Sequence, residues 1–304
     1  MADHGDSATV PVLSGDARLL DLLEPLHGKG SVHSVFARVV NLLTPDDALI
    51  ALAARGSGDA PRTLTADVPD WSAYQLSAGH SVTFATGNLS FDGPRLRLVT
   101  AGARAWRPAA PSLTALPPGA LAAAADTMDR ICRAHGPLGG MLGAAPGAGP
   151  MERAVVDALH AGRTTLLDAV RDGRAAPVRR GVLALLGLGP GLTPAGDDFL
   201  TGLVLVAALP GSRLAAFPPL LREVLAAHGR RTTALSLATL HEAAEGRVRS
   251  ELLDLAVLLA AGDPGAALHA SVRKVLAIGH SSGGDTLSGL VAGLHLEEEL
   301  RGSL

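Results

Sequence analysis

The sequence contains a single cysteine, Cys132, in a chain of 304 residues. One cysteine excludes an internal disulfide and a cysteine-based structural zinc site. Because Cys132 falls within an apolar helical pattern, we expect a buried structural thiol, with a catalytic nucleophile as the alternative. The fold must therefore depend on its apolar core, for which a chain of this length has ample material.

The sequence also lacks an excess of basic charge and a long hydrophobic run. Its formal net charge is −3 at pH 7, which gives no indication of a nucleic-acid or anionic-membrane partner. The apolar run at residues 203–209 is far shorter than the roughly 20 residues that span a membrane. Residues 1–16 lack the basic and apolar regions of a secretory signal and predict a partly disordered tail. We therefore expect a soluble, cytoplasmic protein.

Between residues 17 and 110 the pattern predicts a β-rich domain. Short apolar and β-branched segments alternate there with turn signals such as Gly87-Asn88 and Asp92-Gly93-Pro94. Strands at this spacing are typical of a small antiparallel sheet or barrel. The expected strands cover residues 34–41, 48–53, 81–85, 89–91 and 96–100.

From residue 118 onward the periodicity is helical, and residues 108–118 are predicted to form a linker. Asp263-Pro264 resembles a helix N-cap followed by proline at the first helical position. We therefore predict an α+β fold, with the β-rich part followed by a larger all-α domain at 118–304. The expected helices cover residues 121–135, 151–172, 177–186, 195–209, 218–229, 232–245, 250–261, 264–278 and 284–300.

Two Gly-rich segments, 188–202 and 279–289, carry the same pattern at an offset of 87 residues. At that offset Asp198 aligns with Asp285, and small residues align on either side of them. Each segment is a hydroxyl-bearing loop that passes through an acidic residue into an apolar stretch. This is the chemistry of a helix N-terminus that holds a ligand. Because two such helix starts could face one site, we place the candidate site here.

The first loop combines glycines with a hydroxyl and carboxylates. Gly189, Gly191 and Gly196 permit positive φ and a close approach of the backbone to a ligand. Thr193 is placed either to cap the following helix or to donate its hydroxyl to a bound anion. In the alternative interpretation, Thr193 and the acidic residues from Asp197 onward only cap a helix in a tight turn.

The aligned carboxylates have two functional interpretations. Asp197, Asp198 and Asp285 could ligate a hard cation such as Mg²⁺, or they could accept hydrogen bonds from a substrate amide or orient a neighbouring group. An anion beside them would require a metal or an arginine between the like charges. Arg230 and Arg231 are the candidates for that role, with a solvated turn as the alternative.

The second loop contains His280 beside two serines. Adjacent residues rarely give the geometry of a nucleophile and its base, and the sequence has no G-x-S-x-G elbow. We therefore interpret His280 as a donor to a phosphate or carboxylate, and we assign no residue to a metal. The candidate catalytic residues are Asp198, Asp285 and His280. The candidate substrate-binding residues in the two loops and the arginine turn are Gly189, Gly191, Thr193, Gly196, Asp197, Arg230, Arg231, Ser281, Ser282 and Gly283.

Residues 187–202, 230–232 and 279–285, together with residues 34–41, resemble the AllH-like family. The named member of that family is a subunit of oxamate carbamoyltransferase, part of a three-component system in anaerobic purine (allantoin) breakdown. The resemblance implies transfer of a carbamoyl group between phosphate and the nitrogen of an amide or amine. It also implies a small anionic substrate, carbamoyl phosphate, and partner subunits, with a homo-oligomer as another arrangement.

Two alternatives remain open at this point. Residues 283–286 resemble the C-terminal motif of the all-helical ADP-ribosylglycohydrolases, which bind two Mg²⁺ ions. Those enzymes usually carry a further aspartate where this chain has Leu287. Mg²⁺ is therefore the one cofactor that the sequence suggests. The second alternative is a non-catalytic subunit that binds a ligand in the same loops without turnover.

Overall fold

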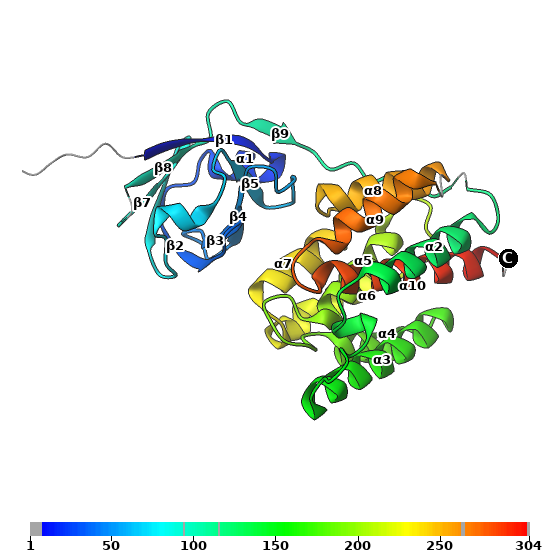
Figure 1. Cartoon of the computed structure of the whole chain (residues 1–304). Helices are drawn as coiled ribbons and strands as arrows, with labels where there is room; N and C mark the ends of the chain where they lie inside the picture. The colour runs from blue at the N-terminus through cyan, green and yellow to red at the C-terminus, as the bar shows by residue number, and fades with distance from the viewer. Residues whose placement is uncertain (1–7, 94, 115, 263–264, 303–304) are drawn as a thin grey trace, which may run out of the picture. The chain divides into compact units, whose positions relative to one another are not determined.

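The chain consists of two compact units, Met1–Pro108 and Ala109–Leu304. A computed structural model describes residues 8–93, 95–114, 116–262 and 265–302 (Figure 1). The first unit is built from strands and the second from helices. The predicted α+β class is therefore confirmed.

Eight strands of the first unit form a closed barrel (Figure 1). They follow one another in the order β5-β4-β3-β2-β6-β7-β8-β1, and β1 pairs with β5 to close the ring. Strand β9 adds to β1 in parallel. The sequence left open whether these strands form a small sheet or a barrel, and the structure shows a barrel. The strands are β1 Ala8–Asp16, β2 Gly28–Val35, β3 Val39–Leu43, β4 Leu49–Ala54, β5 Thr63–Ala66, β6 Ser81–Ala85, β7 Asn88–Phe91, β8 Leu96–Val99 and β9 Arg104–Trp106.

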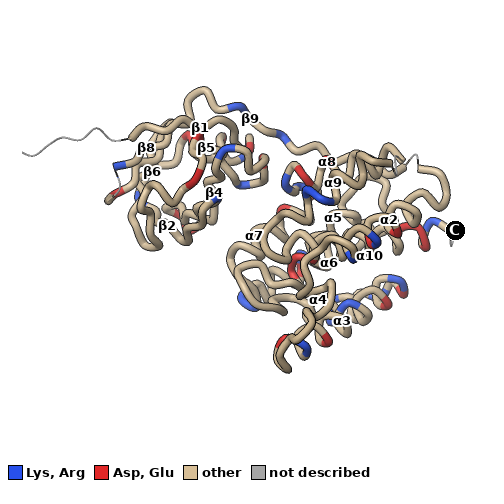
Figure 2. The backbone as a smooth tube through the Cα atoms, in the orientation of Figure 1, with Lys and Arg blue, Asp and Glu red and all other residues tan. Residues whose placement is uncertain are grey.

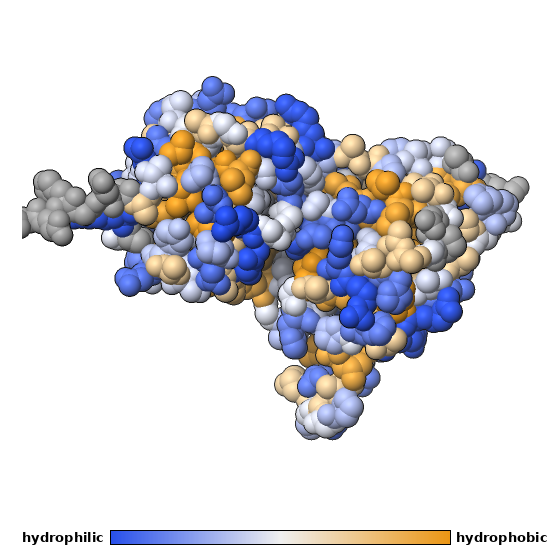
Figure 3. Space-filling view, turned by 45° about the horizontal axis from the view of Figure 1, so that its top comes forward, coloured by the Kyte–Doolittle hydropathy of each residue, from blue (hydrophilic) through white to orange (hydrophobic). Residues whose placement is uncertain are grey.

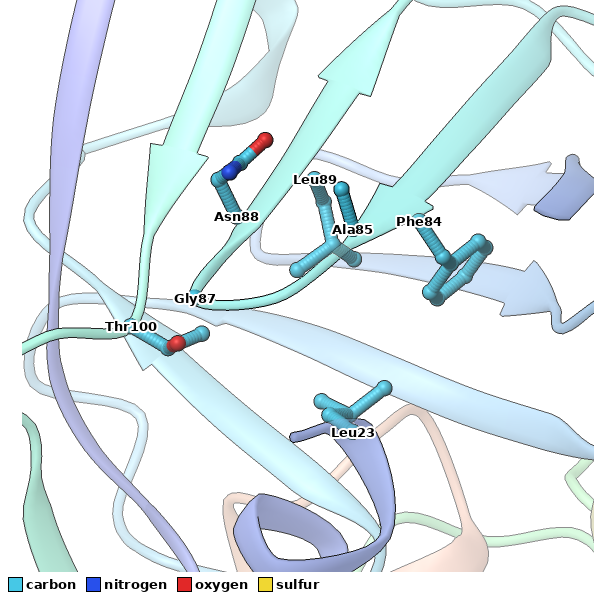
Figure 4. A pocket seen from close by; sticks show the side chains of 7 residues that line it. All are labelled: Leu23, Phe84, Ala85, Gly87, Asn88, Leu89 and Thr100. Atoms are coloured by element: carbon cyan, nitrogen blue, oxygen red, sulfur yellow. The ribbon is translucent and has the colours of Figure 1, made fainter. Parts of the chain in front are cut away.

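Apolar side chains fill the interior of this barrel. Leu42, Leu52, Leu64 and Leu98 are fully buried, and so is Trp71 in the short helix η1 (Trp71–Tyr74). This packing follows from the alternation of inward and outward residues along each strand. A cavity of about 10 Å³ holds roughly one water molecule, and Figure 4 shows the residues around it. Its lining comes from helix α1 (Ala17–Leu23), the β6–β7 hairpin and the end of β8: Leu23, Phe84, Ala85, Gly87, Asn88, Leu89 and Thr100.

The expected strand at residues 34–41 is instead the hairpin between β2 and β3. Ser34 pairs with Asn41 across it, and the Asn41 amide donates to the Ser34 hydroxyl at 2.9 Å. The Arg38 guanidinium donates to the carbonyl oxygens of Arg55 and Pro69, which ties the turn to the rest of the barrel. Because the turn residues 36–38 include no glycine, proline or asparagine, the local sequence carried no turn signal.

The predicted tail at residues 1–16 is also corrected. Residues 8–16 form β1, whereas residues 1–7 lie outside the described part of the chain. Pro11 stands in the middle of β1, opposite Val99 of β8. Because proline cannot donate to a ladder, it argues against a strand in a sequence-based prediction. The burial of Val10 and Val12 nevertheless follows the alternation of a half-buried strand.

The second unit contains nine α-helices within the described residues, close to the predicted ranges. Most are amphipathic and bury one face, as the 3.6-residue period predicts. The predicted N-cap at Asp263-Pro264 lies outside the described residues. The helices are α2 Ala120–His135, α3 Pro150–Arg171, α4 Ala175–Leu185, α5 Ala195–Ala208, α6 Phe217–His228, α7 Ala234–Ala243, α8 Ser250–Ala261, α9 Ala266–Leu276 and α10 Ser282–Gly302, with the single turns η2 Gly140–Leu142 and η3 Gly229–Arg231.

Helices α5 and α10 cross in close contact at the centre of this unit (Figure 1). A Cβ at Gly202 would overlap the carbonyl oxygen of Thr286, and a Cβ at Gly289 would overlap that of Phe199. The two contacts are reciprocal, because both glycines and both partners are related by the offset of 87 residues. Only glycine lets the two backbones approach this closely. The duplicated motif is therefore a pseudo-two-fold pair of helices.

Each of these two helices begins against the end of the helix before it. A Cβ at Gly196 would overlap the carbonyl oxygen of Leu185 in α4, and a Cβ at Gly283 would overlap that of Val275 in α9. The segments α4-loop-α5 and α9-loop-α10 thus share one construction. Their glycines fix where each loop turns into its helix.

Part of the predicted linker at 108–118 packs into the helical unit. Leu113 is fully buried, and its amide donates to the carbonyl oxygen of Pro210 at 2.9 Å. Its own carbonyl accepts from Arg301, which also pairs with the fully buried Glu297 at 2.9 Å. Residue 113 therefore belongs to the core of the helical unit.

The sequence predicted that Cys132 is a buried structural thiol. Cys132 is buried, and burial, with Asp129 adding to it, raises the pKa of its thiol to about 12. The prediction of a buried thiol is confirmed.

Charges of both signs are interspersed along α3 (Figure 2), and hydrophobic and hydrophilic residues intermingle on the face in Figure 3. Among the helices that the structure describes, none has the length and apolar character needed to cross a membrane.

Candidate functional site

The loop between α4 and α5 has a backbone that requires glycine. Gly187, Gly189 and Gly191 have φ of 75°, 120° and 94°, in the left-handed region. A Cβ at Gly187 would overlap the carbonyl oxygen of Arg231, and one at Gly189 would lie 2.8 Å from the amide of Ala195. The loop is therefore folded back tightly on the start of α5 and on the turn before α7.

The two Gly-rich loops touch each other through their hydroxyl groups. The Thr193 Oγ1 lies 2.8 Å from the Ser282 Oγ at the start of α10. The N-cap of α5 is Pro194, and no side chain of the described residues caps this helix end. Thr193 therefore does not cap α5, and its hydroxyl joins the two halves of the duplicated motif. This contact places both helix starts at one site.

Asp198 lies beneath this contact and is 7 % exposed. Burial raises the pKa of its carboxyl to about 8, and the negative charges of Asp285 and Asp197 add to the effect. The hydroxyls of Ser282 and Thr193 lower the pKa in part by bonding to the carboxylate. The Asp198 Oδ2 has no hydrogen-bond partner within the described residues.

Asp285 is its counterpart on α10 and is 1 % exposed. Its Oδ1 accepts a hydrogen bond from the backbone amide of Met141 at 2.6 Å, and its Oδ2 has no partner among the described residues. Burial raises the pKa of this carboxyl to about 6, although the Met141 amide and the Ser281 hydroxyl lower it in part. Two carboxyls with raised pKa values therefore lie side by side under the loops.

The turn η2, which covers Asp285, was not singled out from the sequence. Gly140 has φ of 55°, and a Cβ there would overlap the Asp285 carboxylate. The His160 Nε2 on α3 lies 3.3 Å from the Met141 carbonyl oxygen and so supports the turn from its other side. Residues 137–150 lie between the predicted helices at 121–135 and 151–172, and nothing local connects them to Asp285, which lies 144 residues away from Met141.

Asp197 has a different position from its neighbour Asp198. It is 1 % exposed, and its Oδ1 accepts from the Gly187 amide at 2.8 Å while its Oδ2 accepts from the Thr232 hydroxyl. Burial raises the pKa of this carboxyl, and these hydrogen bonds lower it in part. Asp197 thus ties together the first loop, α5 and the turn before α7.

The remaining candidate residues lie at the surface. Arg230, Arg231 and His280 are exposed, and the Arg231 guanidinium donates to the Leu183 carbonyl oxygen at 3.4 Å. The residues of the arginine turn that reach the site are the Arg231 backbone and Thr232. No group of three or more His, Cys, Asp or Glu side chains that could hold a metal occurs in the described part of the chain.

Replacing Thr232 by valine is expected to lower the free energy of unfolding by about 1–3 kcal/mol, because the buried Asp197 carboxylate loses a donor. Urea unfolding measures the change. Thr164→Val is the matched control, since Thr164 is exposed and its hydroxyl bonds to the carbonyl one turn earlier. Equal effects of the two substitutions would contradict the role assigned to Thr232.

The structure thus defines a two-unit α+β protein: a closed β-barrel, then a helical unit with a duplicated helix start that holds two buried carboxyls. Residues 185–294 match the family model described as oxamate carbamoyltransferase subunit AllH. Residues 11–105 match the AllH family N-terminal domain. The chain therefore belongs to the AllH family, as the sequence motifs indicated. The first match spans both Gly-rich loops, and the second covers most of the barrel. No solved structure matches the chain.

Proposed function

We propose that this chain is a carbamoyltransferase subunit that binds carbamoyl phosphate at the two joined Gly-rich loops. The observation that carries the proposal is the contact between Thr193 and Ser282, which brings two helix starts to one site. Helix N-termini favour anions through their free amides and their dipole. The family's description as a carbamoyltransferase subunit supports the reaction class.

In the proposed reaction the nitrogen of oxamate, or of another amide or amine, attacks the carbonyl carbon of carbamoyl phosphate. A C–N bond forms and the C–O bond to phosphate breaks. The proton of the attacking nitrogen leaves with the phosphate as HPO₄²⁻. The protein's contribution is to position the two reactants and to stabilise the charge of the departing phosphate.

The rim of the loops suits the phosphate end of this ligand. Gly191 and His280 are exposed there, and Ser281 and Ser282 are half-buried. Backbone amides, hydroxyls and an imidazole can all donate to phosphate oxygens. The exposed arginine turn at 229–231 adds positive charge on the neighbouring surface.

The glycohydrolase alternative is less well supported by the structure. Leu287, at the position where those enzymes usually have an aspartate, is fully buried in α10. An aspartate at this position would be buried in the apolar core of the helical unit. We therefore retain carbamoyl transfer, with a non-catalytic binding subunit as the outcome to be tested against it.

The test is formation of N-carbamoyl oxamate from carbamoyl phosphate and oxamate, measured by mass spectrometry. We expect turnover by the chain together with its partner subunits, and a loss of about 10²–10³ in kcat for Asp285→Asn, as for the removal of one group that stabilises a transition state. Asp254→Asn, at an exposed position on α8, is the control and should keep full activity.

Three results can be distinguished. Turnover by the isolated chain would make it the catalyst. Turnover only with partners, unaffected by Asp285→Asn, would favour a non-catalytic subunit. If the complete assembly forms no product, carbamoyl transfer to oxamate is not its reaction.

A further inference from the structure

The site contains two buried oxygen atoms that need a hydrogen-bond donor. They are the Oδ2 of Asp198 and the Oδ2 of Asp285, and neither has a partner among the described residues. The two side chains are 7 % and 1 % exposed, so water contact is small. A buried polar atom without a partner is costly, and a ligand that supplies a donor gains that energy on binding.

The charges around these oxygens exclude an anionic partner. The charges of Asp285 and Asp197 both disfavour ionisation of Asp198. A phosphate oxygen at the same place would meet the same repulsion. The side chains of Arg230 and Arg231 are exposed and so are not placed to neutralise it. A neutral or cationic group that donates hydrogen bonds complements these carboxyls better than an anion does.

The chain itself already provides such a group at one of the two carboxyls. The Met141 amide donates to the Oδ1 of Asp285 at 2.6 Å, and Gly140 lies against the same carboxylate because it has no Cβ. This carboxyl is therefore held so that amide N–H groups approach it. The Ser282 and Thr193 hydroxyls hold the carboxyl of Asp198 from the side of the rim.

We propose that Asp198 and Asp285 form a subsite for a primary amide, in which their unpaired oxygens accept the N–H groups of the ligand. The inference rests on the proposed function, under which the amide is the carbamoyl –CO–NH₂ of the donor and its phosphate lies at the rim. Hydrogen-bond donors of the rim thus bind the phosphate end of the ligand, and the carboxyl oxygens accept from its amide end. The subsite selects –NH₂ against a methyl group of nearly equal size, since a methyl group would leave both oxygens unpaired.

The test compares two non-hydrolysable phosphonates that differ only at this position, phosphonoacetamide and acetonylphosphonate. Binding of each to the full-length chain is measured by isothermal titration calorimetry, with inorganic phosphate and Mg²⁺ alone as further probes. The amide should bind about 10- to 100-fold more tightly than the ketone, as expected when buried oxygens that otherwise lack a partner gain one. In Asp198→Leu and Asp285→Leu this ratio should fall towards one, while Asp254→Leu should keep it.

Each other result overturns a different statement. Equal binding of the two phosphonates to the unmodified chain would refute the amide subsite and leave the phosphate site of the proposed function standing. Binding of Mg²⁺ alone that is lost in both leucine variants would replace the subsite by a metal site. If neither phosphonate nor phosphate binds, both the subsite and the proposed donor site on this chain are wrong. The comparison of the two phosphonates on the unmodified chain tests the amide subsite even if a variant fails to fold.

Discussion

The double variant Gly202→Ala, Gly289→Ala is expected to lose its native helical unit. Each added methyl group would overlap a backbone carbonyl of the facing helix, at Thr286 and at Phe199. A backbone atom cannot rotate away as a side chain can, so α5 and α10 must separate. Overpacking costs about 1–3 kcal/mol for one site, and separating the largely buried helices α5 and α10 adds to it. The sum approaches the total stability of about 5–15 kcal/mol of a typical domain.

Urea unfolding followed by circular dichroism measures this effect. Each single substitution should lower the free energy of unfolding by about 1–3 kcal/mol or more. Gly302→Ala, on the same helix α10, is the matched control because a Cβ there meets no atom of the described residues within 4 Å. A double variant that unfolds at the same urea concentration as the unmodified chain would show that the helices do not cross at these glycines.

Raising the pH from 5 to 9 is expected to destabilise the chain, and Asp198→Asn should remove most of this dependence above pH 6. Burial raises the pKa of Asp198 from 3.8 to about 8 and that of Asp285 to about 6. Below pH 3.8 both groups are protonated in the folded and the unfolded chain. As the pH rises further, the unfolded chain releases protons that the folded chain retains, so unfolding becomes more favourable.

The two groups act over different pH windows. Of these two carboxyls, both contribute between pH 4 and 6, and Asp198 contributes between 6 and 8. Each group contributes at most about 1.4 kcal/mol per pH unit. Scanning calorimetry at five pH values should show a falling Tm in the unmodified chain and a nearly constant one above pH 6 in Asp198→Asn. Asp254→Asn should retain the slope. A Tm that rises between pH 6 and 8 and does not respond to Asp198→Asn would contradict a raised pKa.

The helical unit could be predicted from the sequence because its signals are local. The 3.6-residue period located the helices to within about two residues, as is usual for helix ends. Small residues align on either side of Asp198 and Asp285, and the offset of 87 residues indicated that the two helices correspond. The hydroxyls of Thr193 and Ser282 each stand beside the start of one of these two helices, although the offset itself aligns Thr193 with His280.

The parts of the site that the sequence did not predict come from distant segments. Met141 donates to Asp285, and Thr232 donates to Asp197, yet neither residue type signals a site by itself. In the arginine turn the sequence favoured the charged side chains of Arg230 and Arg231 as site groups. In the structure the groups that reach the site are the Thr232 hydroxyl and the Arg231 backbone. The sequence did not predict strand β1 for a related reason. Its partners β8 and β5 lie far along the chain, and Pro11 interrupts the local pattern of a strand.

The closure of the barrel by β1 has a consequence for how the chain folds while it is being synthesised. Among the strands of this unit β1 is synthesised before the others, whereas β8 and β9, with which it pairs, are synthesised after them. Helix α5 likewise has to wait for α10, the last helix of the described chain. Contacts of such long range form slowly. The growing chain therefore exposes open strand edges and the apolar surface of α5 until each unit is nearly complete, which is the condition that molecular chaperones relieve.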